Sequence, residues 1–237
     1  MSPDLPRNQN NTANCVCCGT RSCCPLGKLS TTARTAIQPL IRKTRFQRDD
    51  VLLDQGKLSP TMKVIQLGLV FELRMGREGR SRPIGVAGRG DPLGLTGFFE
   101  QLNLFSAVAV ISGRLFSIVI SDLRREALSF PEVRSLLHSE AANLGNKMAS
   151  WSEAMRVRGA INQLAYALVL ISETRDSSVI ELPTHTALGD LLGSTRETIV
   201  RSLSVLAKEG AICRMEHRSY LILKSALLER MRHSSCD

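Results

Sequence analysis

The pattern of apolar and polar positions changes about half-way along the chain. Between residues 46 and 120, short apolar runs alternate with Gly, Pro and Asp, which is typical of strands separated by turns. The predicted strands are residues 64–67, 69–73, 107–111 and 115–120, with residues 76–79 as a hairpin tip. Many short strands with glycine-rich turns indicate a β-sandwich or barrel. A short helix is expected before them, from Leu29 to Ile41.

After Pro131 the apolar residues recur every three or four positions, which predicts a long helix. The stripe resembles a coiled-coil heptad pattern and includes Ala141. One interpretation is a helix that packs on its own domain, and the other is a dimer seam. We expect the seam, formed by Val133, Leu137, Leu144, Met148, Trp151 and Met155.

A second helical region follows at residues 161–171, with a loop at residues 176–178. Thr184 can cap a further helix that Gly193 ends. Ser194 then starts the next helix, with Glu197 three residues on, as in a capping box. Its buried face is expected to be Ile199, Leu203 and Leu206, and its opposite face Arg196, Glu197, Val200, Arg201 and Ser204.

Two short helices joined by a glycine turn, with Arg and Glu near the start of the second, are typical of a DNA recognition helix. Arg can bond to guanine O6 and N7, and Glu can accept from cytosine N4. Residues 211–214 and 219–223 then alternate like a hairpin with its tip at His217-Arg218, as in the wing of a winged helix. The alternative is a generic helical hairpin in which Glu197 only caps.

Residues 189–203, Gly-Asp-Leu-Leu-Gly-Ser-Thr-Arg-Glu-Thr-Ile-Val-Arg-Ser-Leu, resemble the helix-turn-helix of the Crp/Fnr family of bacterial transcription regulators. The resemblance implies a homodimer that binds double-stranded DNA, with RNA polymerase as a second partner and activation as the usual outcome. It also implies an α+β fold: a flexible tail with cysteines (1–28), a jelly-roll-like β-roll sensor domain of the cyclic-nucleotide-binding type (29–127), a dimerisation helix (128–157) and a C-terminal winged helix-turn-helix (158–237).

By the same resemblance, Arg196, Glu197 and Arg201 stand at the three base-reading positions, and Thr195 precedes them. Their identities follow the Crp-type pattern, which implies a palindrome with TGTGA-like half-sites about one helical turn apart. Thr184 and His185, at the start of the first helix, are candidates for contacts with DNA phosphates.

The expected ligand of the sensor domain is not a cyclic nucleotide. Family members that bind one carry Gly-Glu after a strand and then Arg before Ser or Thr. Here Leu95 stands at the Glu position and Phe105 at the Arg position, before Ser106. A cyclic phosphate needs that positive charge.

Five cysteines fall in one ten-residue window, Cys15, Cys17, Cys18, Cys23 and Cys24. Cys15, Cys18 and Cys24 have the spacing of the ligands of the oxygen sensor Fnr, which implies a [4Fe–4S] cluster. The position of the fourth Fnr ligand is Phe116, so Cys17, Cys23 or a carboxylate would have to replace it. Zinc held by four of the cysteines and a thiol–disulfide switch are the alternatives, besides a cysteine-rich tail with no function.

Composition narrows the class of protein. Apolar residues make up 43% and charged residues 22%, which is ordinary for a soluble globular protein. The longest weakly charged stretch is shorter than the roughly 20 apolar residues that a membrane span needs. No apolar segment of a secretory signal is present near Met1, so we expect a cytoplasmic location and no membrane partner.

The net charge of +9 favours a polyanionic partner. Residues 158–237, however, hold ten basic and nine acidic residues, while residues 29–127 hold 15 basic and nine acidic ones. Arg74, Arg77, Arg80 and Arg82 lie around the predicted hairpin tip and are expected to be a solvated turn. The surplus of positive charge therefore lies outside the predicted DNA-reading domain.

No enzyme is expected. A thiol oxidoreductase would need Cys-x-x-Cys on a thioredoxin-like frame, and Cys15-x-x-Cys18 lies beside a polar tail instead. A ligand-binding module that regulates a partner protein without binding DNA is the remaining alternative.

Overall fold

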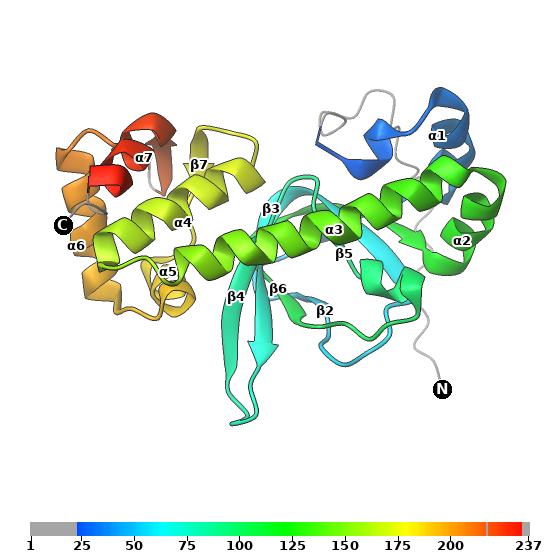
Figure 1. Cartoon of the computed structure of the whole chain (residues 1–237), viewed down its shortest axis with the longest axis horizontal. Coiled ribbons are helices and arrows are strands. Elements are labelled where there is room, and N and C mark those ends of the chain that lie inside the picture. The colour runs from blue at the N-terminus through cyan, green and yellow to red at the C-terminus, as the bar shows by residue number, and fades with distance from the viewer. Residues whose placement is uncertain (1–22, 217, 234–237) are drawn as a thin grey trace.

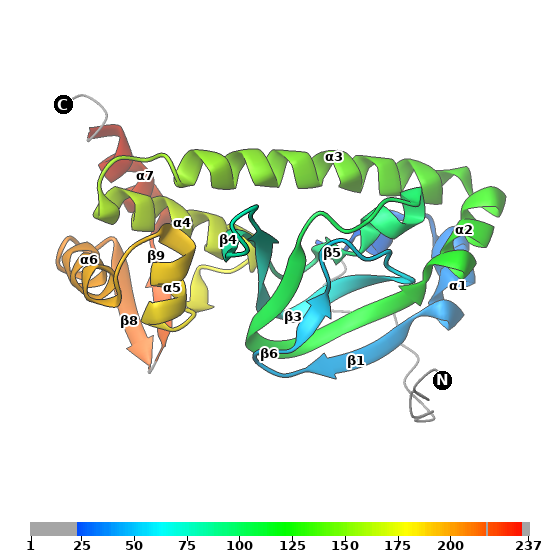
Figure 2. The ribbon, with the colours of Figure 1, turned by 90° about the horizontal axis from the view of Figure 1, so that it is seen from below.

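The structure, a computed structural model, describes residues 23–216 and 218–233. Figure 1 shows an elongated molecule in which a sheet-rich half and a helical C-terminal half are joined by one long helix, α3 (Pro131–Ala154). Figure 2 shows α3 lying along one side of the sheet. Among the described helices, none has the length and apolar character needed to cross a membrane.

The sensor half is one antiparallel sheet of six strands with the order β1-β6-β3-β4, in which β2 also pairs with β6 and β5 with β3. Its strands are β1 (Arg42–Phe46), β2 (Val51–Leu53), β3 (Thr61–Met75), β4 (Ser81–Ala87), β5 (Pro92–Leu93) and β6 (Ser106–Val119). The predicted hairpin tip at residues 76–79 is confirmed, because Gly76 N donates to Arg80 O between β3 and β4.

The four predicted strands are parts of two long strands, β3 and β6. Gly68 interrupts the first apolar pattern and Gly113 the second, but both lie at irregularities of the ladder instead of at turns. A Cβ on Gly113 would lie 1.9 Å from Leu67 O, so the two backbones approach closely there. Ile120, expected to end a strand, begins a helix instead.

Short helices close one end of the sheet. They are η1 (Pro25–Lys28), α1 (Thr31–Ile37), η2 (Gln38–Leu40), η3 (Leu95–Phe99) and α2 (Ile120–Ser129). α1 with η2 corresponds to the helix expected between Leu29 and Ile41. Ser30 caps α1 by accepting from Ala33 N at 3.3 Å. These helices share an apolar core with Phe116 of β6 and the first turns of α3.

The dimer-seam prediction is wrong for three of its six residues, because this chain buries Val133, Leu137 and Trp151 itself. Val133 and Leu137 lie in the core below α1 and α2, and Trp151 packs against β4, where a Cβ on Gly85 would lie 3.4 Å from its Cδ1. Leu144 and Met155 are half-buried against the two other cores, and Met148 is half-buried as well. A heptad-like stripe shows that a helix has an apolar partner but does not identify it, and here the partner is the chain's own sheet.

The exposed face of α3 carries small and polar residues. They recur at the same spacing of three and four as the buried stripe: Ser135, His138, Ala142, Gly145, Ala149 and Ser152. A Cβ on Gly145 would meet nothing within 4 Å, so this face offers a flat backbone to any partner helix.

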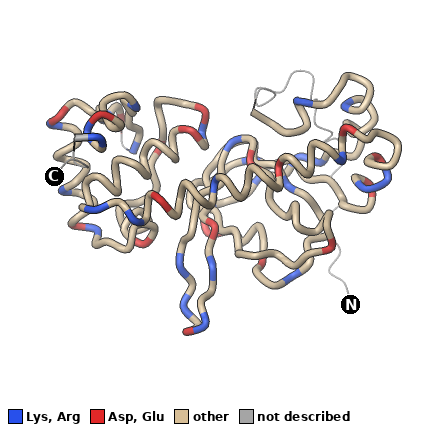
Figure 3. The backbone as a smooth tube through the Cα atoms, in the orientation of Figure 1, with Lys and Arg blue, Asp and Glu red and all other residues tan. Residues whose placement is uncertain are grey.

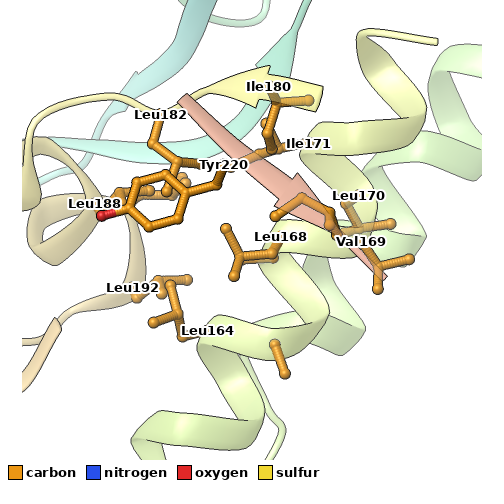
Figure 4. Packing of buried hydrophobic residues seen from close by; sticks show 14 of the residues in the cluster. Leu164, Leu168, Val169, Leu170, Ile171, Ile180, Leu182, Leu188, Leu192 and Tyr220 are labelled. Carbon is orange, nitrogen blue, oxygen red and sulfur yellow. The ribbon is translucent and has the colours of Figure 1, made fainter. Parts of the chain in front are cut away.

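The C-terminal half is a three-stranded sheet, of order β7-β9-β8, packed with helices. Its elements are α4 (Ala160–Thr174), β7 (Val179–Glu181), α5 (His185–Leu192), α6 (Arg196–Lys208), β8 (Ile212–Glu216), β9 (Ser219–Ile222) and α7 (Lys224–His233). Figure 4 shows Leu164 and Leu168 of α4 facing Leu188 and Leu192 of α5, with Tyr220 of β9 beside them. This core fixes α5 and α6 relative to the rest of the domain.

Candidate nucleic-acid interface

The turn between α5 and α6 forms as the sequence predicts. Thr184 caps α5, because its side-chain oxygen accepts from Ala187 N at 3.2 Å. Gly193 follows α5 in the left-handed conformation, with φ of 60°. A Cβ on Gly189 would lie 2.7 Å from Ser194 O, so α5 and the turn pack closely.

The cap of α6 is Thr195, whereas the sequence predicted Ser194. The backbone N–H of Ser194 donates to Gly189 O at 2.8 Å, which places Ser194 inside the turn. Thr195 is the next residue, and its hydroxyl accepts from Thr198 N at 3.2 Å. Glu197 therefore lies one position too early for the predicted capping box, and its carboxylate is not used as a cap.

One face of α6 is exposed and carries charge, and the other is buried. Ile199, Leu203 and Leu206 are between 0% and 5% exposed in the domain core, as predicted. The exposed residues are Arg196, Glu197, Val200, Arg201 and Ser204. The side chains of Arg196 and Glu197 are 63% and 71% exposed and approach each other only to 4.0 Å. An ion pair of this kind contributes little, so both groups are available to a ligand.

His185, the first residue of α5, lies beside the same surface. Burial lowers its pKa from the usual value, and Arg196 and Arg214 lower it further. The imidazole is therefore neutral at neutral pH and acts as a hydrogen-bonding group, not as a second cation for a phosphate.

The predicted wing is confirmed as the β8–β9 hairpin. His217, expected at its tip, lies outside the described residues. Arg218 does not extend freely from the tip, because its Nη2 lies 3.2 Å from Glu181 Oε1 of β7. β7 is not predictable from the sequence because it has only three residues, but its pairing with β9 attaches the wing to the domain.

The comparisons with known proteins agree with this geometry. Residues 162–231 match the family model of the Crp-like helix-turn-helix domain. The transcriptional regulator SdrP of Thermus thermophilus is 28% identical over 183 residues, which cover 73% of this chain and 86% of SdrP. The cyclic AMP receptor protein of the same organism is 28% identical over 184 residues, 75% of this chain and 82% of that protein. The C-terminal domain is a helix-turn-helix domain of the Crp/Fnr type.

The fold of the whole chain also matches solved structures. FixK2 from Bradyrhizobium japonicum superposes with a TM-score of 0.65 at 20% identity, over 80% of this chain and 96% of FixK2. The β-sheet sensor, the long helix and the C-terminal helix-turn-helix follow the expected order. The chain is a transcriptional regulator with a DNA-binding domain of the Crp/Fnr type.

In the sensor half, the two residues predicted to stand at the phosphate-binding positions are apolar and buried. Phe105 is 5% exposed and lies in one core with Ala107 and Leu115. Leu95, where nucleotide-binding members have Glu, is 3% exposed.

The structure describes only part of the cysteine cluster. Cys15, Cys17 and Cys18 lie outside the described residues. Cys24 is 5% exposed and belongs to the same apolar core as Phe116, the residue at the family's fourth ligand position. Within the described ranges, no three His, Cys, Asp or Glu residues come together to hold a metal ion.

Cys23 has different surroundings from its neighbour. It is half-buried and lines a cavity of about 390 Å³ together with Lys147 of α3 and Asp91. Burial raises the pKa of its thiol, against the lowering effect of Arg89. Of the two adjacent thiols, Cys23 is therefore the one that a ligand could approach, and Cys24 is held in an apolar core.

Proposed function

We propose that this regulator binds, as a homodimer, a DNA palindrome with TGTGA-like half-sites and reads the bases with Arg196, Glu197 and Arg201. The observation that carries the proposal is the two-sided character of α6. Its apolar face is buried in the domain, and all three of these side chains are exposed on the other. Such a helix can lie in the major groove without disturbing its own core.

The chemistry of the three residues fits the proposed half-site. Arg196 and Arg201 can each donate two hydrogen bonds to guanine, and Glu197 can accept from the amino group of cytosine. The N-terminus of α6, where Thr195 occupies only the N–H of Thr198, is a favourable place for a phosphate of the DNA backbone. Thr184 and the neutral His185 stand at the start of α5, where they can contact phosphates.

Sequence-specific binding is tested by fluorescence anisotropy with a TGTGA palindrome and with a scrambled duplex of the same composition. The proposal expects much tighter binding to the palindrome, and a fall in affinity as salt rises. Equal affinity for the two duplexes would contradict it and would favour the alternative of a ligand-binding module that does not read DNA.

The proposed dimer contact is the exposed face of α3, since the apolar stripe is already buried. Ala142, Gly145 and Ala149 lie on this face, and small side chains let two helices approach closely. Ala149→Arg should yield monomers in sedimentation, whereas Asn143→Arg, on another exposed side of α3, should leave the dimer intact. Dimers of the Ala149→Arg variant would refute the assignment.

For the signal, we propose an iron–sulfur site in the N-terminal cysteine cluster, with zinc or a thiol–disulfide switch as the second candidate. The spacing of Cys15, Cys18 and Cys24 supports it. Because Phe116 stands at the expected position of the fourth ligand, Cys17, Cys23 or a carboxylate would have to complete the ligand set. Phe105 supports the expectation that no cyclic nucleotide is sensed.

Anaerobic purification followed by an absorption spectrum and analysis of iron, zinc and labile sulfide distinguishes these candidates. An iron–sulfur site predicts brown protein with iron and sulfide in equal amounts, reduced by Cys23→Ser if Cys23 is a ligand. Colourless protein without iron or sulfide would exclude the cluster, and zinc in its place would establish the second candidate.

RNA polymerase in the cytoplasm is the proposed partner of the DNA-bound dimer, with activation as the outcome. In vitro transcription from a promoter with the palindrome upstream tests this. Transcription that rises with added protein supports activation, and transcription that falls would show repression instead.

A further inference from the structure

The β3–β4 hairpin carries a positive charge that the proposed base-reading surface does not use. Residues 74–82 contain four arginines and one acidic residue, and all of them are exposed. Figure 3 shows the basic positions distributed along both strands of the hairpin, which projects away from the body of the molecule.

Two of the four arginines are occupied within the chain. Arg74 donates to Leu104 O at 2.7 Å, and Arg82 pairs with Glu78 at 2.7 Å. Among the ion pairs and side-chain hydrogen bonds found in the described residues, none involves the guanidinium group of Arg77 or Arg80. These two guanidinium groups at the tip are therefore free to bind an external anion.

The hairpin pairs like charges. In the β3–β4 register, Arg74 stands directly opposite Arg82. Like charges in opposite cross-strand positions destabilise a sheet. Arg82 offsets part of this repulsion by pairing with Glu78, whereas Arg77 and Arg80 at the tip have no such counter-charge among the described ion pairs.

The base of the hairpin lies against the helix-turn-helix. Arg82 and Pro83 of β4 line a groove whose other wall includes Thr184, Gly193 and Ser194. Figures 1 and 2 both show α6, α5 and the β3–β4 hairpin in that order along one side of the molecule. A DNA backbone that passes the start of α5 would therefore next meet the arginines of the hairpin.

We propose that Arg77 and Arg80 bind the phosphate backbone of the duplex that flanks the half-site read by α6. The proposal rests on the DNA-binding function proposed above. Arginine binds phosphate oxygens through two parallel hydrogen bonds, and such contacts carry no sequence information. Through such contacts the surplus positive charge of the sensor half increases the affinity for DNA, while the residues of α6 determine the sequence specificity.

The groove favours DNA over an acidic protein segment as the occupant. Its wall on the helix-turn-helix side is the start of α5 and the turn before α6, which are the places where this kind of domain meets phosphates. The basic β3–β4 hairpin lies next to these places and extends the surface that would face phosphates. An acidic surface of RNA polymerase is the other possible occupant, and the test below separates the two.

The test compares the Arg77→Ala/Arg80→Ala double variant with the full-length wild type on two duplexes, by anisotropy between 50 and 200 mM salt. One duplex contains only the palindrome, and the other extends it by about one helical turn on each side. Arg45→Ala/Arg114→Ala, a pair of exposed arginines in register on β1 and β6, removes the same charge elsewhere on the sensor.

The proposal expects wild type to bind the long duplex more tightly than the short one. Its slope of log affinity against log salt should be steeper on the long duplex by about 2 per protomer. The tip variant should lose this gain and bind the short duplex normally, while the control retains it.

Three results would overturn the proposal: no dependence on the flanks in wild type, equal losses in the tip variant and the control, or normal DNA binding with impaired transcription by polymerase. The last result would assign the hairpin to a protein partner. Failure to bind the short duplex, by contrast, would refute the DNA-binding function itself.

Discussion

Glu72 should make the stability of this protein depend on pH. It lies on β3, 4% exposed, opposite Gly85 of β4. A Cβ on Gly85 would lie 2.7 Å from Glu72 Oε2 and 3.4 Å from Trp151 Cδ1, so the carboxyl group is enclosed between the sheet and α3. Burial raises its pKa from 4.5 to about 7, while Lys147 lowers it and Asp91 raises it further.

The direction and size of the effect follow from this pKa. Between pH 4.5 and about 7 the folded protein keeps a proton on Glu72 that the unfolded chain has released. The free energy of unfolding therefore falls as pH rises through this window, by about 3 kcal/mol, and is level above it. Glu72→Gln keeps the shape of the side chain and removes the titration.

Urea denaturation from pH 5 to pH 8.5, followed by the fluorescence of Trp151, measures the difference directly, since the chain has one tryptophan. The variant should gain stability relative to wild type as pH rises and exceed it by up to about 3 kcal/mol at pH 8.5. Glu216→Gln, exposed on β8, is the control and should show no such trend. A difference between Glu72→Gln and wild type that is constant with pH would refute the reasoning.

Five further substitutions test the local structure in three places. Thr195→Ala should cost about 1 kcal/mol in urea denaturation through loss of the α6 cap, and Ser194→Ala almost nothing; equal costs would mean that Ser194 caps after all. Ile199→Ala should cost roughly 2–5 kcal/mol and its exposed neighbour Val200→Ala less than about 0.5, so similar thermal midpoints would contradict the orientation of α6. Gly113→Ala, whose Cβ would meet Leu67 O, should destabilise by roughly 1–3 kcal/mol, and unchanged unfolding would argue against the close approach of β3 and β6.

The features that sequence reasoning predicts correctly here depend on neighbours in the chain. The cap at Thr184, the end of α5 at Gly193 and the buried face of α6 are each fixed within about one turn of helix. The same local rules fail by one residue at Ser194, because a contact with Gly189 across the turn decides which hydroxyl becomes the cap.

The features that sequence reasoning missed depend on distant partners. The stripe on α3 is apolar in either interpretation, and only the position of the sheet shows that Trp151 faces Gly85 and not a second subunit. β7 is too short to recognise without its partner β9. Gly68 and Gly113 indicate breaks in the pattern, but whether such a glycine lies in a turn or in a bulge is decided by the neighbouring strand.

The same distinction between neighbours in the chain and distant partners applies to the candidate site. The exposure of Arg196, Glu197 and Arg201 follows from helix periodicity and could be predicted. The unequal surroundings of Cys23 and Cys24 could not, because Cys24 is buried in an apolar core whose other members include residues of β3, β6 and α3, far away in the sequence.

The most direct test of base reading by α6 is the affinity of wild type, Arg196→Ala and Arg201→Ala for a set of palindromes in which each base pair of the TGTGA half-site is changed in turn. Each variant should bind the intact palindrome about 1–3 kcal/mol more weakly and lose discrimination at one base pair only. Equal binding of all half-site variants by wild type and both substituted proteins would contradict the assignment of these residues.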